Sequence, residues 1–249
     1  FDVQSTSAAT SIDAAAGNDT FNISSDAPTN AGNLDTITAT LTITGGDDDD
    51  SLILSDAGGA TANANVVITD SSVTGLAGPA DDVDVLIDTI EAVQVVGNAS
   101  DESFSLQPSS GSTRFDLSGG DGDDLFDIRP MAGIQARIDG GPHSTADELA
   151  VEGQTGLPID DGTKVTVDGT SEIQYVGIET VTLTCATCAV FPLIAPLTSL
   201  GGIAVDAAMS SPDDSSDTTD DPDWMESLAD AHHHQEPLAV KKLRRSIAI

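Results

Sequence analysis

The chain has 249 residues, of which 42 are acidic and only 8 are basic, so its formal net charge at pH 7 is −34. This balance excludes a nucleic-acid binder, which needs basic side chains to neutralise phosphates, and disfavours a peripheral protein on an anionic membrane. Hydrophobic residues make up 39% of the chain and aromatic residues only 3%, so the core must be built mainly from Val, Ile, Leu and Ala. The composition is typical of an acidic extracellular protein, or of one that holds cations with its carboxylates.

A short pattern recurs along the chain: a small or Gly-rich turn, an acidic residue, and then two apolar residues separated by one position. Five copies occupy residues 17–23, 45–54, 97–106, 119–128 and 140–151. Their first large apolar residues are Phe21, Leu52, Phe104, Phe126 and Leu149. These lie 31, 52, 22 and 23 positions apart, and we expect the gap of 52 to hold an extra turn of chain whose motif has decayed. Residues 1–3 resemble the end of a further copy, so we expect the chain to begin inside a repeat of a longer array.

The segments between these turns predict strands. Residues 37–44 alternate apolar side chains with Thr, and the segment 90–95 is matched by 178–183, 88 positions later. A strand–turn–strand unit of about 22 residues cannot bury its apolar side alone, whereas copies stacked ~4.8 Å apart can. We therefore predict an all-β fold, a parallel β-solenoid with Gly/Asp turns over residues 1–187. A tandem β-sandwich is the alternative, because strands at this spacing also suit sandwiches.

The character of the chain changes after Thr187. Residues 188–211 are apolar with Pro and Gly, and we expect a cap or linker there; the prolines and glycines argue against a membrane span. Residues 212–223 are almost entirely Asp, Ser and Thr, so we predict that 212–249 is a disordered acidic tail. The tail ends in a short basic amphipathic segment, 238–249, for which docking on an anchoring partner is one hypothesis.

One copy carries a more specific pattern. Residues 119–127 fit the nonapeptide G-G-x-G-x-D-x-U-x, with Asp124 in the acid position, and residues 45–53 fit it except that Asp48 replaces a glycine. This resembles the RTX (hemolysin-type) calcium-binding repeats, and more broadly the Asp/Gly-rich repeats of large secreted and surface proteins of bacteria. The resemblance implies calcium at the turns, with carboxylate oxygens as ligands. The candidate metal ligands are Asp47, Asp49, Asp50, Asp121, Asp123, Asp124 and Asp147.

The sequence departs from the RTX pattern in one respect, because its copies are about 20 to 50 residues apart rather than in tandem. An ion would then have to lie between turns of neighbouring repeats, and the turns 119–124 and 140–147 are the best pair because they are consecutive. The alternative is structural, since Gly, Asp and Asn are also the residues that tight turns use.

We predict a non-catalytic structural or adhesive region of an extracellular or cell-surface protein. Its expected partners are calcium ions, stacked neighbouring repeats of the parent chain, and cell-surface or matrix components. The alternative function is a carbohydrate-active β-helix enzyme, similar to polysaccharide lyases, which would need Arg114, Arg129, Arg137 or Lys164 to meet acids in an open groove.

Three smaller features are also interpreted from the sequence. Aligning the Gly-Gly pairs places Arg137 beside Asp116 and predicts an ion pair between neighbouring repeats. Cys185 and Cys188 could form a redox pair, half of a zinc site or a small closed loop, and a loop at a strand end is favoured. His143 is expected to be an isolated, exposed residue in a Gly-Pro turn.

Overall fold

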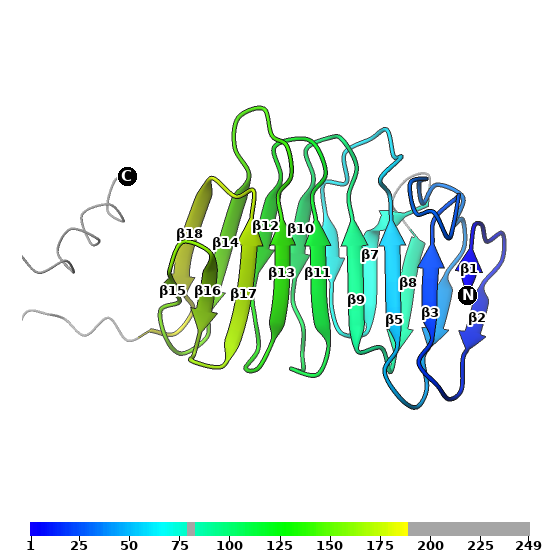
Figure 1. Ribbon diagram of the computed structural model, residues 1–249, viewed down its shortest axis with the longest axis horizontal. Helices are drawn as coiled ribbons and strands as arrows, with labels where there is room; N and C mark the ends of the chain where they lie inside the picture. Colours follow the sequence, from blue (N-terminus) through cyan, green and yellow to red (C-terminus); the bar gives the residue numbers. More distant parts are fainter. Residues whose placement is uncertain (79–82, 189–249) are drawn as a thin grey trace, which may run out of the picture. The chain divides into compact units, whose positions relative to one another are not determined.

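The computed structural model describes residues 1–78 and 83–188 of the chain (Figure 1). The predicted tail of residues 212–249, and all but the first residue of the predicted linker 188–211, lie outside the described residues. The described part is all-β, with eighteen strands and no helix. Among the described residues there is accordingly no helix that could span a membrane.

The strands form two nine-stranded sheets. The first sheet has the order β1 (Asp2–Val3), β3 (Thr20–Ile23), β5 (Ser51–Ser55), β9 (Ala92–Val96), β11 (Arg114–Ser118), β13 (Gln135–Asp139), β17 (Ser171–Val176), β16 (Lys164–Val167) and β15 (Ile159–Asp160). The second has the order β18 (Thr180–Cys185), β14 (Glu148–Gly153), β12 (Leu125–Ile128), β10 (Ser103–Leu106), β6 (Val66–Ile68), β7 (Ser72–Ala77), β8 (Val83–Asp88), β4 (Leu41–Thr44) and β2 (Thr10–Asp13).

The chain passes back and forth between the two sheets, and most neighbouring strands are parallel. From β9 to β14 it alternates strictly, so that β9, β11 and β13 pair in the first sheet while β10, β12 and β14 pair in the second. Two insertions make the sheets mixed: β6–β8 and β15–β17 add antiparallel pairs. The predominance of parallel pairs argues against the tandem β-sandwich, whose sheets are antiparallel.

The core consists of the alternate side chains of each strand, which point between the sheets and belong to one hydrophobic cluster. The predicted apolar residues of the repeats are all completely buried, but they fall into two stacks rather than one series. Phe21 pairs with Leu52 in the first sheet, whereas Phe104, Phe126 and Leu149 follow one another in the second. The gap of 52 residues does hold an extra turn with a decayed motif, because β9 pairs with β5 and Val93 lies opposite Leu52, but the gap also contains the β6–β8 insertion and a change of sheet.

Two local predictions are confirmed at the ends of the described region. Residues 1–3 do pair as a copy of residues 20–23: Val3 lies opposite Ile23, and the rings of Phe1 and Phe21 stack with centroids 5.0 Å apart. Cys185 and Cys188 form a disulfide at the end of β18, which agrees with the small closed loop among the interpretations of that pair.

Candidate cation-binding turns

Acidic residues form two rows along the sheets, each acid immediately preceding the first residue of a strand. The first acid row belongs to the first sheet and contains Asp19, Asp50 and Glu91, which precede β3, β5 and β9. The second acid row belongs to the second sheet and contains Glu102, Asp124, Asp147 and Glu179, which precede β10, β12, β14 and β18. The parallel register of the strands brings these acids next to one another.

Within each row, one carboxylate oxygen accepts a hydrogen bond from the backbone N–H of the preceding acid. In the first acid row the N–H of Asp19 donates to Asp50 Oδ1 at 2.7 Å, and that of Asp50 donates to Glu91 Oε2 at 2.8 Å. In the second acid row the distances are 2.8 Å from Glu102 N to Asp124 Oδ1, 2.8 Å from Asp124 N to Asp147 Oδ1, and 2.9 Å from Asp147 N to Glu179 Oε2. The carboxylates thus satisfy backbone donors that the turns leave without a partner in the sheet.

The other carboxylate oxygen of the buried aspartates has a different environment. Asp50 Oδ2, Asp124 Oδ2 and Asp147 Oδ2 are buried and have no hydrogen-bond partner. Each lies against the first glycine of its turn: a Cβ added to Gly45, Gly119 or Gly140 would lie 2.2, 1.9 or 2.5 Å from the respective oxygen. These turns need glycine because the carboxylate fills the space of a side chain, together with the carbonyl oxygen of Thr89 at Gly45 and of Gly177 at Gly140.

The second acid row is electrostatically unfavourable when every member is charged. Burial, followed by the charge of Asp124, raises the pKa of Glu102 to about 8. Burial raises the pKa of Asp124 to about 6, against the opposing effect of the Glu102 backbone N–H, and burial also raises the pKa of Asp147. A proton or a bound cation would relieve the repulsion.

The structure separates the seven predicted ligands by environment. Asp50, Asp124 and Asp147 are buried members of the two rows, and Asp124 and Asp147 are neighbours, as expected for consecutive turns. Asp47, Asp49 and Asp121 are exposed. Asp123 caps the next turn, because its Oδ1 accepts hydrogen bonds from the backbone N–H groups of Ser144, Thr145 and Ala146 at 2.9, 2.6 and 3.3 Å.

Sequence reasoning did not include Glu91 and Glu179 among the candidate ligands, although a signal for them existed. The matching segments 90–95 and 178–183 each place a glutamate one residue before a strand. Glu91 and Glu179 then accept the N–H of Asp50 and of Asp147, respectively, and so occupy the same place in the two rows. The correspondence of the two segments was visible, but its connection to the acid position of the motif was not.

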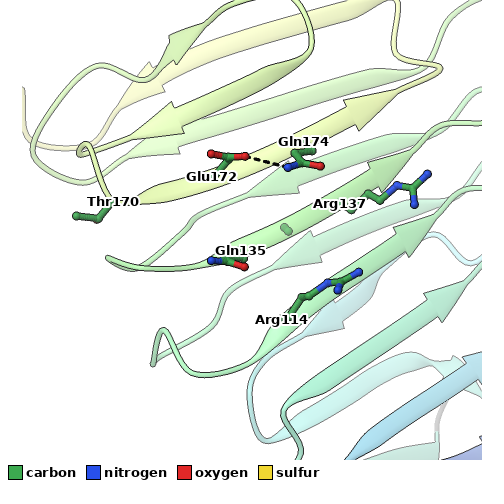
Figure 2. A pocket seen from close by; sticks show the side chains of 7 residues that line it. Arg114, Gln135, Arg137, Thr170, Glu172 and Gln174 are labelled. Carbon is green, nitrogen blue, oxygen red and sulfur yellow. Dashed lines mark hydrogen bonds between the residues drawn. The ribbon is translucent and has the colours of Figure 1, made fainter.

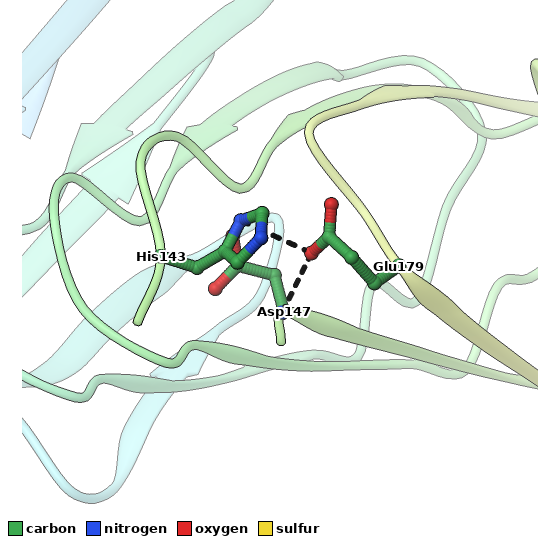
Figure 3. Close-up of side chains that lie close together, drawn as sticks. All are labelled: His143, Asp147 and Glu179. Carbon is green, nitrogen blue, oxygen red and sulfur yellow. Dashed lines mark hydrogen bonds and ion pairs between the residues drawn. The ribbon is translucent and has the colours of Figure 1, made fainter. Parts of the chain in front are cut away.

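His143 is not the isolated residue that the sequence suggested. Its Nδ1 lies 3.2 Å from Glu179 Oε2 and 3.6 Å from Asp147 Oδ2, so that the histidine and the end of the second acid row form one cluster (Figure 3). The signal was absent from the sequence because Glu179 lies 36 positions after His143, outside the five copies of the motif.

The arginines lie on two different sheets. Arg114 and Arg137 line a pocket on the first sheet together with Gln135, Glu172 and Gln174 (Figure 2). Arg129 follows β12 of the second sheet and pairs with Asp127 at 2.9 Å. The arginines that could act together are therefore Arg114 and Arg137.

The predicted neighbourhood of Arg137 is only half correct. The register of β11 and β13 does place Arg137 opposite Asp116. The ion pair of Asp116 is formed instead with Arg114, on its own strand, at 2.9 Å. Arg114 lies on the same face two residues away, so it reaches the carboxylate without crossing to the next strand.

Comparison with protein-family models, with curated proteins and with solved structures finds no match to this chain.

Proposed function

We propose that the chain is a non-catalytic structural repeat region, a parallel β-solenoid that serves as an acidic spacer or adhesive element outside the cell. The observation that carries this proposal is the hydrogen bonding of the acidic side chains in the two acid rows. In both rows, a carboxylate of one repeat accepts the backbone N–H of the previous repeat, so the acids connect neighbouring repeats. Strictly alternating strands, with 22 residues between Phe104 and its partner Phe126, support a solenoid with one strand per sheet in each turn.

The extracellular location is proposed from charge and cysteine chemistry. The net charge of −34 makes the surface strongly anionic. A net charge far from zero favours solubility and opposes association between protein molecules. The Cys185–Cys188 disulfide is the form that cysteines adopt in oxidising compartments.

Calcium is the cation that we propose for the acid-rich turns 47–50 and 121–124. Exposed carboxylates lie close in sequence there, at Asp47, Asp49 and Asp121, beside the buried Asp50 and Asp124. Calcium accepts six to eight oxygen ligands in flexible geometry, and these include backbone carbonyls and water. A turn that offers only a few carboxylates can therefore still supply a weak calcium site. A ligand that binds the folded chain alone raises its stability by mass action.

Thermal denaturation of the whole chain tests the calcium proposal. We expect millimolar calcium to raise the melting temperature relative to the same protein in chelator, and magnesium at equal ionic strength to have a smaller effect. The variants Asp121→Asn and Asp49→Asn should reduce the calcium response, whereas Asp84→Asn should not, because Asp84 is an exposed acid within strand β8 and lies in neither turn. Superimposable melting curves in calcium and in chelator would overturn calcium binding and leave the structural role of the acid rows untouched.

A carbohydrate-active enzyme remains the second candidate, because Arg114, Arg137 and Glu172 line one pocket. Two of these side chains already have partners: Arg114 pairs with Asp116, and Glu172 accepts a hydrogen bond from Lys164 Nζ at 3.0 Å. Incubation with uronic-acid polysaccharides, monitored by the ultraviolet absorbance of unsaturated products, tests this function. Product formation that the Arg137→Ala variant abolishes would favour the enzyme over the spacer.

A further inference from the structure

The cluster of His143, Asp147 and Glu179 differs from the rest of the two acid rows because it includes a nitrogen ligand. The Asp147 side chain is fully buried, and its Oδ2 has no hydrogen-bond partner although it points toward the imidazole. The side chains of His143 and Glu179 are 32% and 37% exposed, so solvent reaches the cluster. A buried carboxylate oxygen without a partner calls for a proton or a cation at this position.

The spacing of the ligand atoms fits a small divalent transition metal. Zinc binds nitrogen and oxygen ligands at ~2.0–2.1 Å in tetrahedral geometry, which puts neighbouring ligand atoms about 3.3–3.4 Å apart. The two distances from His143 Nδ1, 3.2 Å to Glu179 Oε2 and 3.6 Å to Asp147 Oδ2, lie on either side of this value. One oxygen from each acid and the imidazole nitrogen all lie within 4.8 Å of one another.

The ligand types discriminate between metals. Calcium and magnesium are hard cations that take oxygen ligands, whereas imidazole suits zinc and its first-row neighbours. We propose that His143, Asp147 and Glu179 bind one Zn²⁺ or a similar divalent transition-metal ion, with water at the solvent side. The three ligands come from the turn before β14 and the turn before β18, so the ion would connect two neighbouring strands of the second sheet. This site is independent of the calcium proposed for the turns 47–50 and 121–124.

The surroundings fix part of the site before any metal binds. The other oxygen of Asp147, Oδ1, is held by the N–H of Asp124 at 2.8 Å, and Glu179 Oε2 accepts the N–H of Asp147 at 2.9 Å. Hydrogen bonds of this kind orient metal ligands and reduce the ordering that binding requires.

Isothermal titration of the metal-free whole chain with ZnCl₂ tests the proposal. His232, His233 and His234 could bind zinc by themselves, so the reference protein is the triple alanine variant at these positions. We expect this variant to bind one equivalent of zinc, Co²⁺ to give the visible absorption of a tetrahedral site, and calcium to fail to displace either ion. Adding His143→Gln to the reference should weaken zinc binding by more than about tenfold, while its circular dichroism spectrum stays unchanged because residue 143 lies in an exposed turn.

A second variant separates metal binding from a simple ion pair between His143 and the acids. Glu179→Gln preserves the size of the side chain and should also weaken zinc binding by more than about tenfold. If the reference protein binds no zinc, or if His143→Gln and Glu179→Gln bind zinc as tightly as the reference, the site is overturned. The calcium-dependent melting of His143→Gln should equal that of the reference, so failure of this site and failure of the calcium proposal are distinguishable.

Discussion

The Oδ2 atom of Asp124 occupies the space in which a side chain on Gly119 would begin, since a Cβ at residue 119 would lie only 1.9 Å from it. The same relationship joins Gly140 to Asp147 and Gly45 to Asp50. In these three copies the first glycine and the acid of the motif are therefore one packing unit, and the pattern that resembles a calcium-binding sequence has a structural explanation within the chain itself.

This packing predicts a coupling between residues 119 and 124. Gly119→Ala should lower the free energy of unfolding by about 1–3 kcal/mol, because the added methyl group meets a buried carboxylate. Asp124→Ala should cost a similar amount, about 1–3 kcal/mol, because it leaves the N–H of Glu102 without its acceptor. In the double variant the clash with the carboxylate is gone, although the Cβ of residue 119 would still lie 2.8 Å from the carbonyl oxygen of Gly140. The loss of stability in the double variant should therefore be smaller than the sum of the two single losses by about 1 kcal/mol or more.

Urea denaturation of the four proteins measures this coupling energy. Gly156→Ala is the matched control, because its Cβ would meet only the side-chain oxygen of Asp168, at 3.1 Å, and should be tolerated far better. Strict additivity of the two substitutions would show that Gly119 and Asp124 act separately and would contradict the packing explanation.

The parts of the fold that follow from the repeats could be predicted from the sequence. Aligned Gly-Gly pairs gave the register that places Arg137 opposite Asp116, because β11 and β13 each end directly before such a pair. The two stacks could not be predicted, since the acid position of the first sheet decays after Glu91: Thr113 precedes β11 and the apolar Ile134 precedes β13. Without an acid before them, β11 and β13 are marked only by the Gly-Gly pairs that follow them, and those pairs belong to the motif copies of the second sheet.

Only part of the candidate site could be predicted from the sequence. Asp124 and Asp147 were paired correctly because they come from consecutive copies of the motif. The partner of His143 could not be found, since neither its spacing from Glu179 nor its position in a Gly-Pro turn resembles a metal motif. The contact exists because the parallel register places β18 beside β14.

The raised pKa of Glu102 predicts that stability decreases with pH. The folded-state pKa of about 8 lies above the ordinary value of 4.5, so the neutral carboxyl is favoured on folding. Its contribution is fully present below pH 4.5 and is lost as the pH rises toward about 8. We expect the free energy of unfolding to fall over this interval, and Glu102→Gln, which is neutral throughout, to reduce the slope and to be more stable than the wild type at pH 8.

Urea denaturation at several pH values between 5 and 8.5 provides the measurement. Glu148→Gln serves as the control, because it removes one negative charge from an exposed position in the same sheet. Equal slopes for Glu102→Gln and the wild type would mean that Glu102 is charged in the folded protein and that its burial is relieved in another way.

Substitutions of Asp123 and Asp121 compare the stability contributed by an acid that caps a turn with that contributed by an exposed acid. Asp123 accepts three backbone N–H groups of the next turn, with that of Thr145 the main cause of a pKa well below the ordinary range. A lowered pKa contributes stability that is present above the unfolded-state value near 4 and is lost as the pH falls below it. Asp123→Ala should therefore lower the melting temperature clearly at pH 7 and less at pH 3.

The adjacent exposed Asp121 provides the comparison within the same turn. Asp121→Ala should leave the melting temperature in chelator nearly unchanged at both pH values, because Asp121 is exposed. Differential scanning calorimetry in chelator gives both numbers. Equal losses for the two variants would show that the turn responds to net charge and not to the three hydrogen bonds of Asp123.

Residue 48 occupies the position of Gly122 in the motif and shares its left-handed backbone, with φ of 81° for Asp48 and 127° for Gly122. A residue with a Cβ pays strain in this region, so Asp48→Gly should raise the free energy of unfolding by up to about 1 kcal/mol. Gly122→Ala should lower it by more than about 2 kcal/mol, since its Cβ would lie 2.3 Å from the carbonyl oxygen of Ser100. Asp47→Gly removes the same charge at a residue without positive φ and should lower stability by about 0.5–1 kcal/mol. Urea denaturation in chelator compares the three variants, and a loss of stability in Asp48→Gly equal to that in Asp47→Gly would show that the backbone at residue 48 is not strained.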